Sequence, residues 1–130
     1  MKVIKQTYLI NAPVEEVWKA LVDLKFIDGW GGGPAKMDGK SGTKFSLWGG
    51  EIFGENKKVI EHKLLVQDWF SKEEKREKPT KVTFNLAFQN GKTELELIHE
   101  DVPEKDEQNI SDGWKDYYLG PLKDYLESKN

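Results

Sequence analysis

Apolar and polar residues alternate over much of the chain, and this alternation predicts β-strands. The pattern is clearest in residues 80–89 and 92–102, where nearly every second side chain is apolar. Because successive side chains of a strand point to opposite faces, both segments predict a sheet with one apolar and one polar face. The strand-like segments are residues 3–10, 43–48, 51–60, 62–70, 80–89 and 92–102.

Short turn signals separate the later segments and favour hairpins over crossovers. Asn90 and Gly91 form the strongest signal, since this dipeptide suits the positive φ angles of a type I′ turn. Gly49 and Gly50 suit a second turn, and the charged run at residues 72–78 is typical of a solvated hairpin tip. These strands therefore predict an antiparallel meander.

Helical periodicity appears at both ends of the chain. Residues 11–23 and 24–30 predict a pair of helices before the meander, and a long helix is predicted near the C-terminus. A sheet with one apolar face needs a cover, and the C-terminal helix supplies one. The expected fold is two-layer α+β in a single domain over residues 1–130, in the order β-α-α-β-β-β-β-β-α.

The C-terminal helix carries an irregularity, because Gly120 and Pro121 lie in its middle. Pro121 falls inside the apolar stripe and cannot bond the carbonyl of Tyr117. We expect a bend that opens space beside Trp114 and Tyr118. The alternative is that one helix ends near Gly120 and a second begins at Pro121.

Composition narrows the classes of partner and location. The 130 residues include 20 Lys plus Arg and 23 Asp plus Glu, so the net charge of −3 predicts neither nucleic-acid nor anionic-membrane binding. No segment is apolar enough to span a membrane. The absence of cysteine excludes thiolate metal sites and fits a reducing cytoplasm. We expect a cytoplasmic protein, and we favour a monomer.

No motif identifies a cofactor or a metal. Residues 34–42 approach a phosphate-binding loop at Gly39, Lys40 and Ser41, but Pro34 replaces the first glycine and the following segment is strand-like. Two histidines without cysteine do not favour a structural metal site. We expect no cofactor.

His99 is the one residue that suggests acid–base chemistry. It continues the inward series of Leu95 and Leu97, so its imidazole should meet the apolar side of the sheet. There it would bond a polar group of a ligand, act as an acid or base, or simply bond a backbone carbonyl in the core.

Aromatic residues form the second candidate site. Their positions predict convergence on the space between the sheet and the C-terminal helix, where they would line an apolar pocket or pack as ordinary core. The candidate ligand-binding residues are Trp30, Phe45, Trp69, Phe84, Phe88, His99, Trp114 and Tyr118. Trp48 alternates away from this set and would suit a protein contact if exposed.

The chain resembles a known family in residues 10–33, 44–55, 90–103 and 113–126 and in Trp69. "INAPVEEVWKALVDLKFIDGWGGG", "NGKTELELIHEDVP" and "GWKDYYLGPLKDYL" are similar to the activator of the ninety-kilodalton heat-shock protein ATPase, above all its C-terminal half, within the START-like superfamily. The resemblance implies a helix-grip (Bet v 1-like) fold, a curved six-stranded antiparallel sheet around a long C-terminal helix. It does not imply one activity, since the superfamily includes lipid and hormone binders, cyclases and chaperone-binding modules.

These observations leave three hypotheses. The first is a non-enzymatic domain that binds a small hydrophobic or amphipathic ligand between the sheet and the C-terminal helix. The second is a chaperone-associated interaction module that uses Trp48 and the loop around residues 31–33. The third is a cavity enzyme that uses His99.

Overall fold

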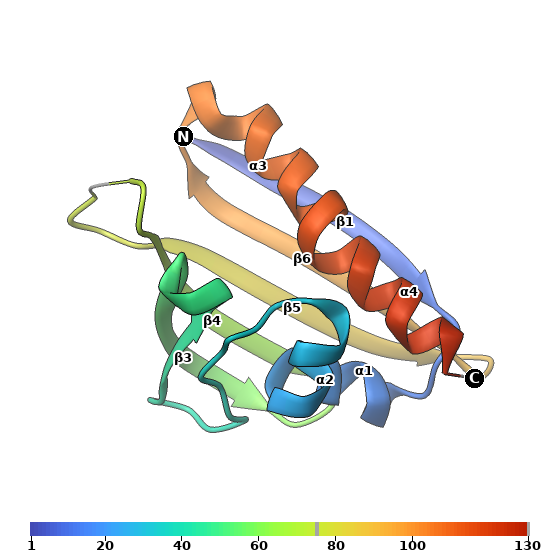
Figure 1. Ribbon diagram of the computed structural model, residues 1–130. Helices are drawn as coiled ribbons and strands as arrows, with labels where there is room; N and C mark the ends of the chain where they lie inside the picture. The colour runs from blue at the N-terminus through green and yellow to red at the C-terminus, as the bar shows by residue number, and fades with distance from the viewer. Residues whose placement is uncertain (75, 130) are drawn as a thin grey trace.

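A six-stranded antiparallel sheet and a long C-terminal helix form the two layers of the protein (Figure 1). The computed structural model describes residues 1–74 and 76–129. The strands are β1 (Lys2–Ile10), β2 (Lys44–Leu47), β3 (Ile52–Ile60), β4 (Leu64–Ser71), β5 (Thr80–Gln89) and β6 (Lys92–Val102). The helices are α1 (Val14–Val22), α2 (Leu24–Trp30), η1 (Trp48–Gly50), η2 (Glu104–Asp106), α3 (Glu107–Gly113), η3 (Trp114–Leu119) and α4 (Gly120–Ser128).

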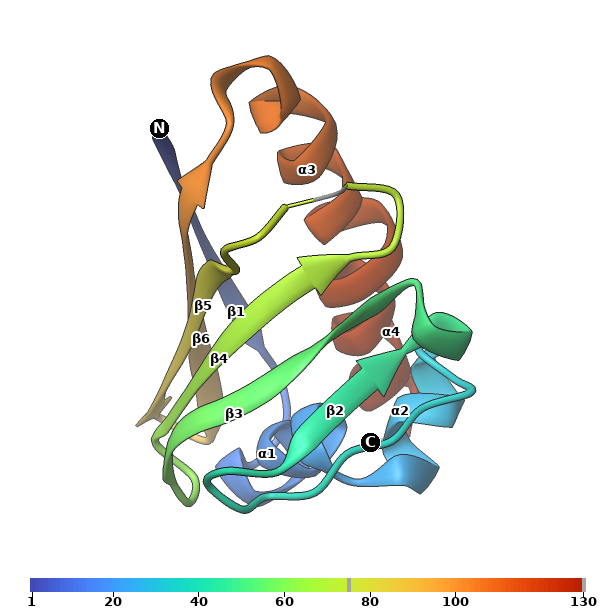
Figure 2. The same cartoon turned by 90° about the vertical axis from the view of Figure 1, so that its left-hand side faces the viewer.

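The sheet has the strand order β1-β6-β5-β4-β3-β2, so only β1 leaves its sequence neighbours and pairs with β6. The sheet curves around the C-terminal helix, and α1 and α2 lie together at one end of it (Figure 2). This arrangement confirms the predicted helix-grip fold and the predicted order of elements. The hairpin between β5 and β6 turns at Asn90 and Gly91, whose φ angles of 49° and 81° are both positive, as a type I′ turn requires.

The core lies between the concave face of the sheet and the helices. The C-terminal helix buries Trp114, Tyr118, Leu119, Leu122 and Leu126. Alternate residues of the strands point toward this helix and pack against it. The apolar face of α1 joins the same cluster. Burial of these side chains contributes on the order of 25 cal/mol per Å² of apolar surface, which makes this single core the main source of stability.

The C-terminal helix continues through the glycine and proline (Figure 1). The predicted alternative of two separate helices is wrong, because α3, η3 and α4 follow one another without a break from Glu107 to Ser128. η3 is a π-helical segment, and the Gly120 N–H bonds the carbonyl of Lys115 instead of the usual partner four residues back. The widened turn accommodates Pro121 at the start of α4.

The widened turn requires glycine at position 120, whereas the helix does not require glycine at position 113. A Cβ at Gly120 would collide with the Lys115 carbonyl oxygen, whereas a Cβ at Gly113 meets no described atom within 4 Å. Both residues have helical backbone angles. We therefore predict that Gly120→Ala lowers the free energy of unfolding by about 2 kcal/mol, whereas Gly113→Ala raises it by about 0.5 kcal/mol.

Urea denaturation of the two variants and the parent protein measures both effects. Equal or greater stability of Gly120→Ala would show that the π-helical segment does not depend on the missing side chain.

Candidate functional site

Two adjoining pockets lie between the C-terminal helix and the end of the sheet where β3 and β4 meet η1. The first, which we call the aromatic groove, has a volume of about 350 Å³ and is almost entirely apolar. It is lined by Trp48, Glu51, Ile52, Trp69, Ile110, Gly113, Trp114, Tyr117 and Tyr118. The second, the polar pocket, has a volume of about 300 Å³ and shares Ile52, Trp69 and Ile110 with the groove. A molecule with an apolar body and a polar end would find both environments side by side.

The floor of the aromatic groove is a stack of buried rings. The Trp69 and Trp114 rings stack with their centroids 4.7 Å apart, and Tyr118 lies 4.9 Å from Trp114. Beneath them, Trp30 stacks on Tyr118 at 4.5 Å. Ring pairs in such offset geometries contribute about 0.5–1.5 kcal/mol each beyond their burial, so the floor is rigid before any ligand arrives.

A series of buried hydrogen bonds starts at the Trp69 side chain and holds its ring in place. Its indole N–H donates to the Gln67 side-chain oxygen at 2.8 Å, and the Gln67 amide donates to Asn56 Oδ1 at 2.8 Å. Asn56 in turn donates to the backbone carbonyls of Asp38 and Lys40. The series links the groove to the loop before β2, and it fixes the orientation of the Trp69 ring.

His99 joins Trp69 to the C-terminal helix. The Trp114 indole N–H donates to His99 Nδ1 at 3.0 Å, which leaves the ring proton on Nε2, 2.9 Å from Thr80 Oγ1. The Thr80 hydroxyl donates to the carbonyl oxygen of Trp69 at 3.3 Å. Burial, aided by the positive charge of Arg76, lowers the pKa of His99 to about 4, so the imidazole is neutral at pH 7.

This geometry does not favour the cavity-enzyme hypothesis. Both ring nitrogens of His99 are engaged by protein side chains, and the ring is only 3 % exposed. A general base needs a free lone pair within reach of a substrate. His99 is instead a positioning residue that holds Trp114 against the sheet.

The Tyr118 hydroxyl is the one buried polar side-chain group without a hydrogen bond among the described residues. Tyr118 is 1 % exposed, and burial raises the pKa of its phenol well above the ordinary value. An unpaired buried hydroxyl costs about 1–3 kcal/mol, so the structure retains it at some expense in stability. It adds a latent hydrogen-bonding group to the ring cluster that forms the groove.

The structure brings most of the predicted aromatic residues together, in two layers. Trp69, Trp114 and Tyr118 line the aromatic groove, and Trp69 and His99 line the polar pocket. Trp30, Phe45 and Phe84 belong to the buried core and line neither pocket.

Phe88 does not belong to the site. Its side chain is 58 % exposed near the tip of the β5–β6 hairpin, so its predicted place in the cavity is wrong. Alternation correctly predicted that Phe88 lies on the inner face of the sheet, because its cross-strand partner Thr93 is buried on that face. Alternation cannot show how far the covering layer extends.

Trp48 was expected to point away and instead lines the groove. β2 ends at Leu47, and Trp48 begins η1 with a φ of 49°, so strand alternation no longer applies. Its indole N–H donates to the Gly31 carbonyl at 2.9 Å, and its ring packs edge-on against Trp30. The predicted site also left out five residues that line the groove: Glu51, Ile52, Ile110, Gly113 and Tyr117.

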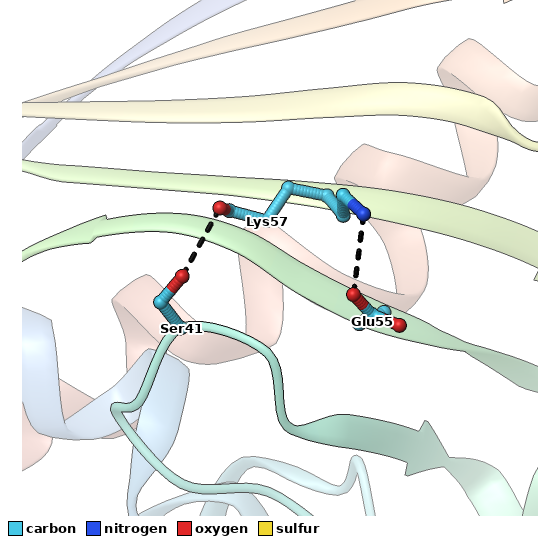
Figure 3. Close-up of polar contacts among 3 residues, drawn as sticks. All are labelled: Ser41, Glu55 and Lys57. Carbon is cyan, nitrogen blue, oxygen red and sulfur yellow. Dashed lines mark hydrogen bonds and ion pairs between the residues drawn. The ribbon is translucent and has the colours of Figure 1, made fainter.

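The segment that approaches a phosphate-binding loop serves to hold β3. The Ser41 hydroxyl donates to the Lys57 carbonyl at 3.1 Å, and the Lys57 ammonium group pairs with Glu55 at 3.2 Å (Figure 3). The Gly42 N–H donates to the Asn56 carbonyl at 2.7 Å. These polar groups are therefore used within the protein. In the described part of the chain, no cluster of metal-ligating residues is found and no helix is long and apolar enough to cross a membrane.

The fold and the groove define a helix-grip protein, and comparison with known proteins gives the family. Residues 11–127 match the family described as "Activator of Hsp90 ATPase homolog 1-like protein". The chain belongs to this family, which confirms the resemblance seen in its sequence.

The similar proteins include activators and a protein without an assigned role. The human "Activator of 90 kDa heat shock protein ATPase homolog 1" is 25% identical over 120 residues, which are 92% of this chain and 35% of that protein. An uncharacterized protein of Schizosaccharomyces pombe is 27% identical over 120 residues, which cover 92% of this chain and 36% of that protein. The chain thus spans about a third of the length of these curated relatives.

A solved structure gives the same picture for the fold. The crystal structure of an HSP90 activator from Plasmodium falciparum superposes with a TM-score of 0.86 at 23% identity, over 98% of this chain and 97% of that chain.

The His99 interactions predict a specific pH dependence of stability. Because the pKa of His99 is lowered from 6.5 to about 4 in the folded protein, unfolding takes up a proton between these values. The associated stability is fully present above pH 6.5 and is lost as the pH falls toward 4, by about 3 kcal/mol.

Denaturant unfolding of the parent protein and of His99→Asn across this pH range isolates the effect, because asparagine keeps an acceptor but does not titrate. The difference in unfolding free energy between the two proteins should shrink as the pH falls. A constant difference would contradict the assignment of a buried neutral imidazole.

Proposed function

We propose that the protein is a non-enzymatic binding module that holds a small hydrophobic or amphipathic molecule in the aromatic groove. The observation that carries this proposal is an open apolar groove of about 350 Å³ over a rigid floor of aromatic rings. Its volume lies in the range of about 300–1,000 Å³ that small-molecule sites occupy. A filled core would have left no such groove.

The polar pocket supports an amphipathic rather than a purely apolar ligand. It continues from the groove across Trp69 and Ile110, and its lining includes Glu74, Arg76 and Asn109. An apolar chain in the groove would thus place a polar end beside side chains that hydrogen-bond it. This is the usual division of labour in ligand sites, where apolar walls give affinity and a few polar groups give orientation.

Gly113 offers a direct test, because an added side chain there enters open space. We predict that Gly113→Phe fills the groove and weakens binding of a neutral apolar dye such as Nile red about tenfold or more, with little loss of stability. Lys115→Phe adds the same ring at an exposed position outside the groove and should leave binding unchanged.

Fluorescence titration of the three proteins measures the affinities. Unchanged binding by Gly113→Phe would place the dye elsewhere and contradict the proposed site. Native mass spectrometry of the freshly purified protein then identifies the class of any molecule retained from the cell.

A second candidate function is a contact with the ninety-kilodalton chaperone, and family membership favours it. The outer face of the sheet offers a contact surface, since Phe53 and Phe70 stack there with centroids 5.5 Å apart and Phe53 is 42 % exposed. Trp48, the earlier candidate for such a contact, is occupied within the groove. Three further properties remain predictions from the sequence: a cytoplasmic location, a monomeric state and a single domain.

An ATPase assay with the purified chaperone tests this second function. Stimulation that Phe53→Ser abolishes, with Gly113→Phe still active, would support it and assign it to the outer face. If the parent protein neither binds the chaperone nor stimulates its ATPase, the second function is excluded.

A further inference from the structure

The charge of the aromatic groove is one-sided. Within the described lining, Glu51 is the only charged residue, and no lysine or arginine contributes to the wall. The rest is indole, phenol and aliphatic surface. The polar pocket differs, because its described lining mixes Arg76 and Lys78 with Glu73, Glu74 and Asp106. Of the two pockets, only the groove has charge of a single sign in its described lining, and this can select among ligands by their charge.

The Glu51 carboxylate is available for a ligand. In the described part of the chain it takes part in no ion pair or hydrogen bond, whereas Glu55 and Glu100 are both paired with lysines. The backbone around it is fixed, since the Glu51 carbonyl accepts from the Lys72 N–H at 2.8 Å. Glu51 directly follows η1, whose first residue Trp48 lines the same groove. An exposed, unpaired carboxylate thus lies at the edge of a wall made of aromatic rings.

Aromatic rings and a carboxylate favour the same sign of charge in a ligand. The faces of indole and phenol rings carry partial negative charge, and they attract cations that approach within about 6 Å of the ring centre. An organic ammonium group with several alkyl substituents is weakly hydrated and suits such a wall. An anion would meet both the ring faces and Glu51 unfavourably.

We propose that the aromatic groove is selective for an organic cation. Its alkylated or quaternary ammonium group lies near Glu51, which directly precedes Ile52 at the border with the polar pocket, and its apolar body lies over Trp69 and Trp114. This inference rests on the proposed function, because it names the ligand class of the same groove. Tyr117 takes part at the rim, where its ring is 70 % exposed and free to cover a bound ligand.

Three amphiphiles with the same apolar chain test the inference: octyltrimethylammonium, octyl glucoside and octyl sulfate, each below the concentration at which it forms micelles. We expect the cation to bind about fivefold more tightly than the neutral compound, and the anion more weakly than either. Glu51→Gln should weaken binding of the cation about threefold and leave the neutral compound unchanged.

Two further variants separate the contributions. Glu61→Gln removes the same charge at an exposed position outside the groove and should have no effect. Tyr117→Leu keeps an apolar side chain but removes the ring, so it should weaken binding of the cation alone, again about threefold.

The outcomes distinguish the inference from the function on which it rests. Equal affinities for the three compounds, all lost in Gly113→Phe, would overturn the cation selectivity and leave the groove as an apolar site. Tighter binding of the anion would also overturn it. No binding of any compound would overturn both the selectivity and the proposed function.

Discussion

Trp69 connects the parts of the protein that meet at the groove. Its indole N–H begins the buried chain through Gln67 and Asn56 to the loop before β2. Its carbonyl oxygen accepts from Thr80, which bonds His99 and through it Trp114 on the C-terminal helix. Its ring stacks on Trp114. One residue on β4 thereby fixes the loop, two neighbouring strands and the helix in a single arrangement.

The groove exists because the C-terminal helix and the sheet pack tightly at one end and leave a gap at the other. Toward α4 the helix packs tightly on the sheet through Leu119, Leu122 and Leu126. Toward α3 it presents Gly113, which has no side chain to fill the gap, opposite Ile52 and Trp48. The floor is rigid, the rim carries the exposed ring of Tyr117, and the absence of a side chain at Gly113 keeps the volume between them open.

Local patterns were sufficient for the elements and insufficient for the site. Strand alternation and the Asn90–Gly91 turn depend on neighbours in sequence, so the sheet was predictable, and the resemblance to a family added its curvature. The inward position of His99 followed from alternation, but its partners Thr80 and Trp114 come from two other elements and no local pattern links them. Trp48 and Phe88 were misplaced because their environment depends on where β2 ends and how far the helix layer reaches.

The indole N–H signals of the five tryptophans offer the most direct test of the claim that the groove binds a small molecule. Trp48, Trp69 and Trp114 line the groove, whereas Trp18 lies on α1 and lines neither pocket of the site. In a ¹H–¹⁵N NMR titration with an octyl amphiphile, the signals of Trp48, Trp69 and Trp114 should shift together with one saturating affinity while that of Trp18 stays in place. Shifts confined to Trp18, or no shift of the groove tryptophans at saturating ligand, would contradict the account.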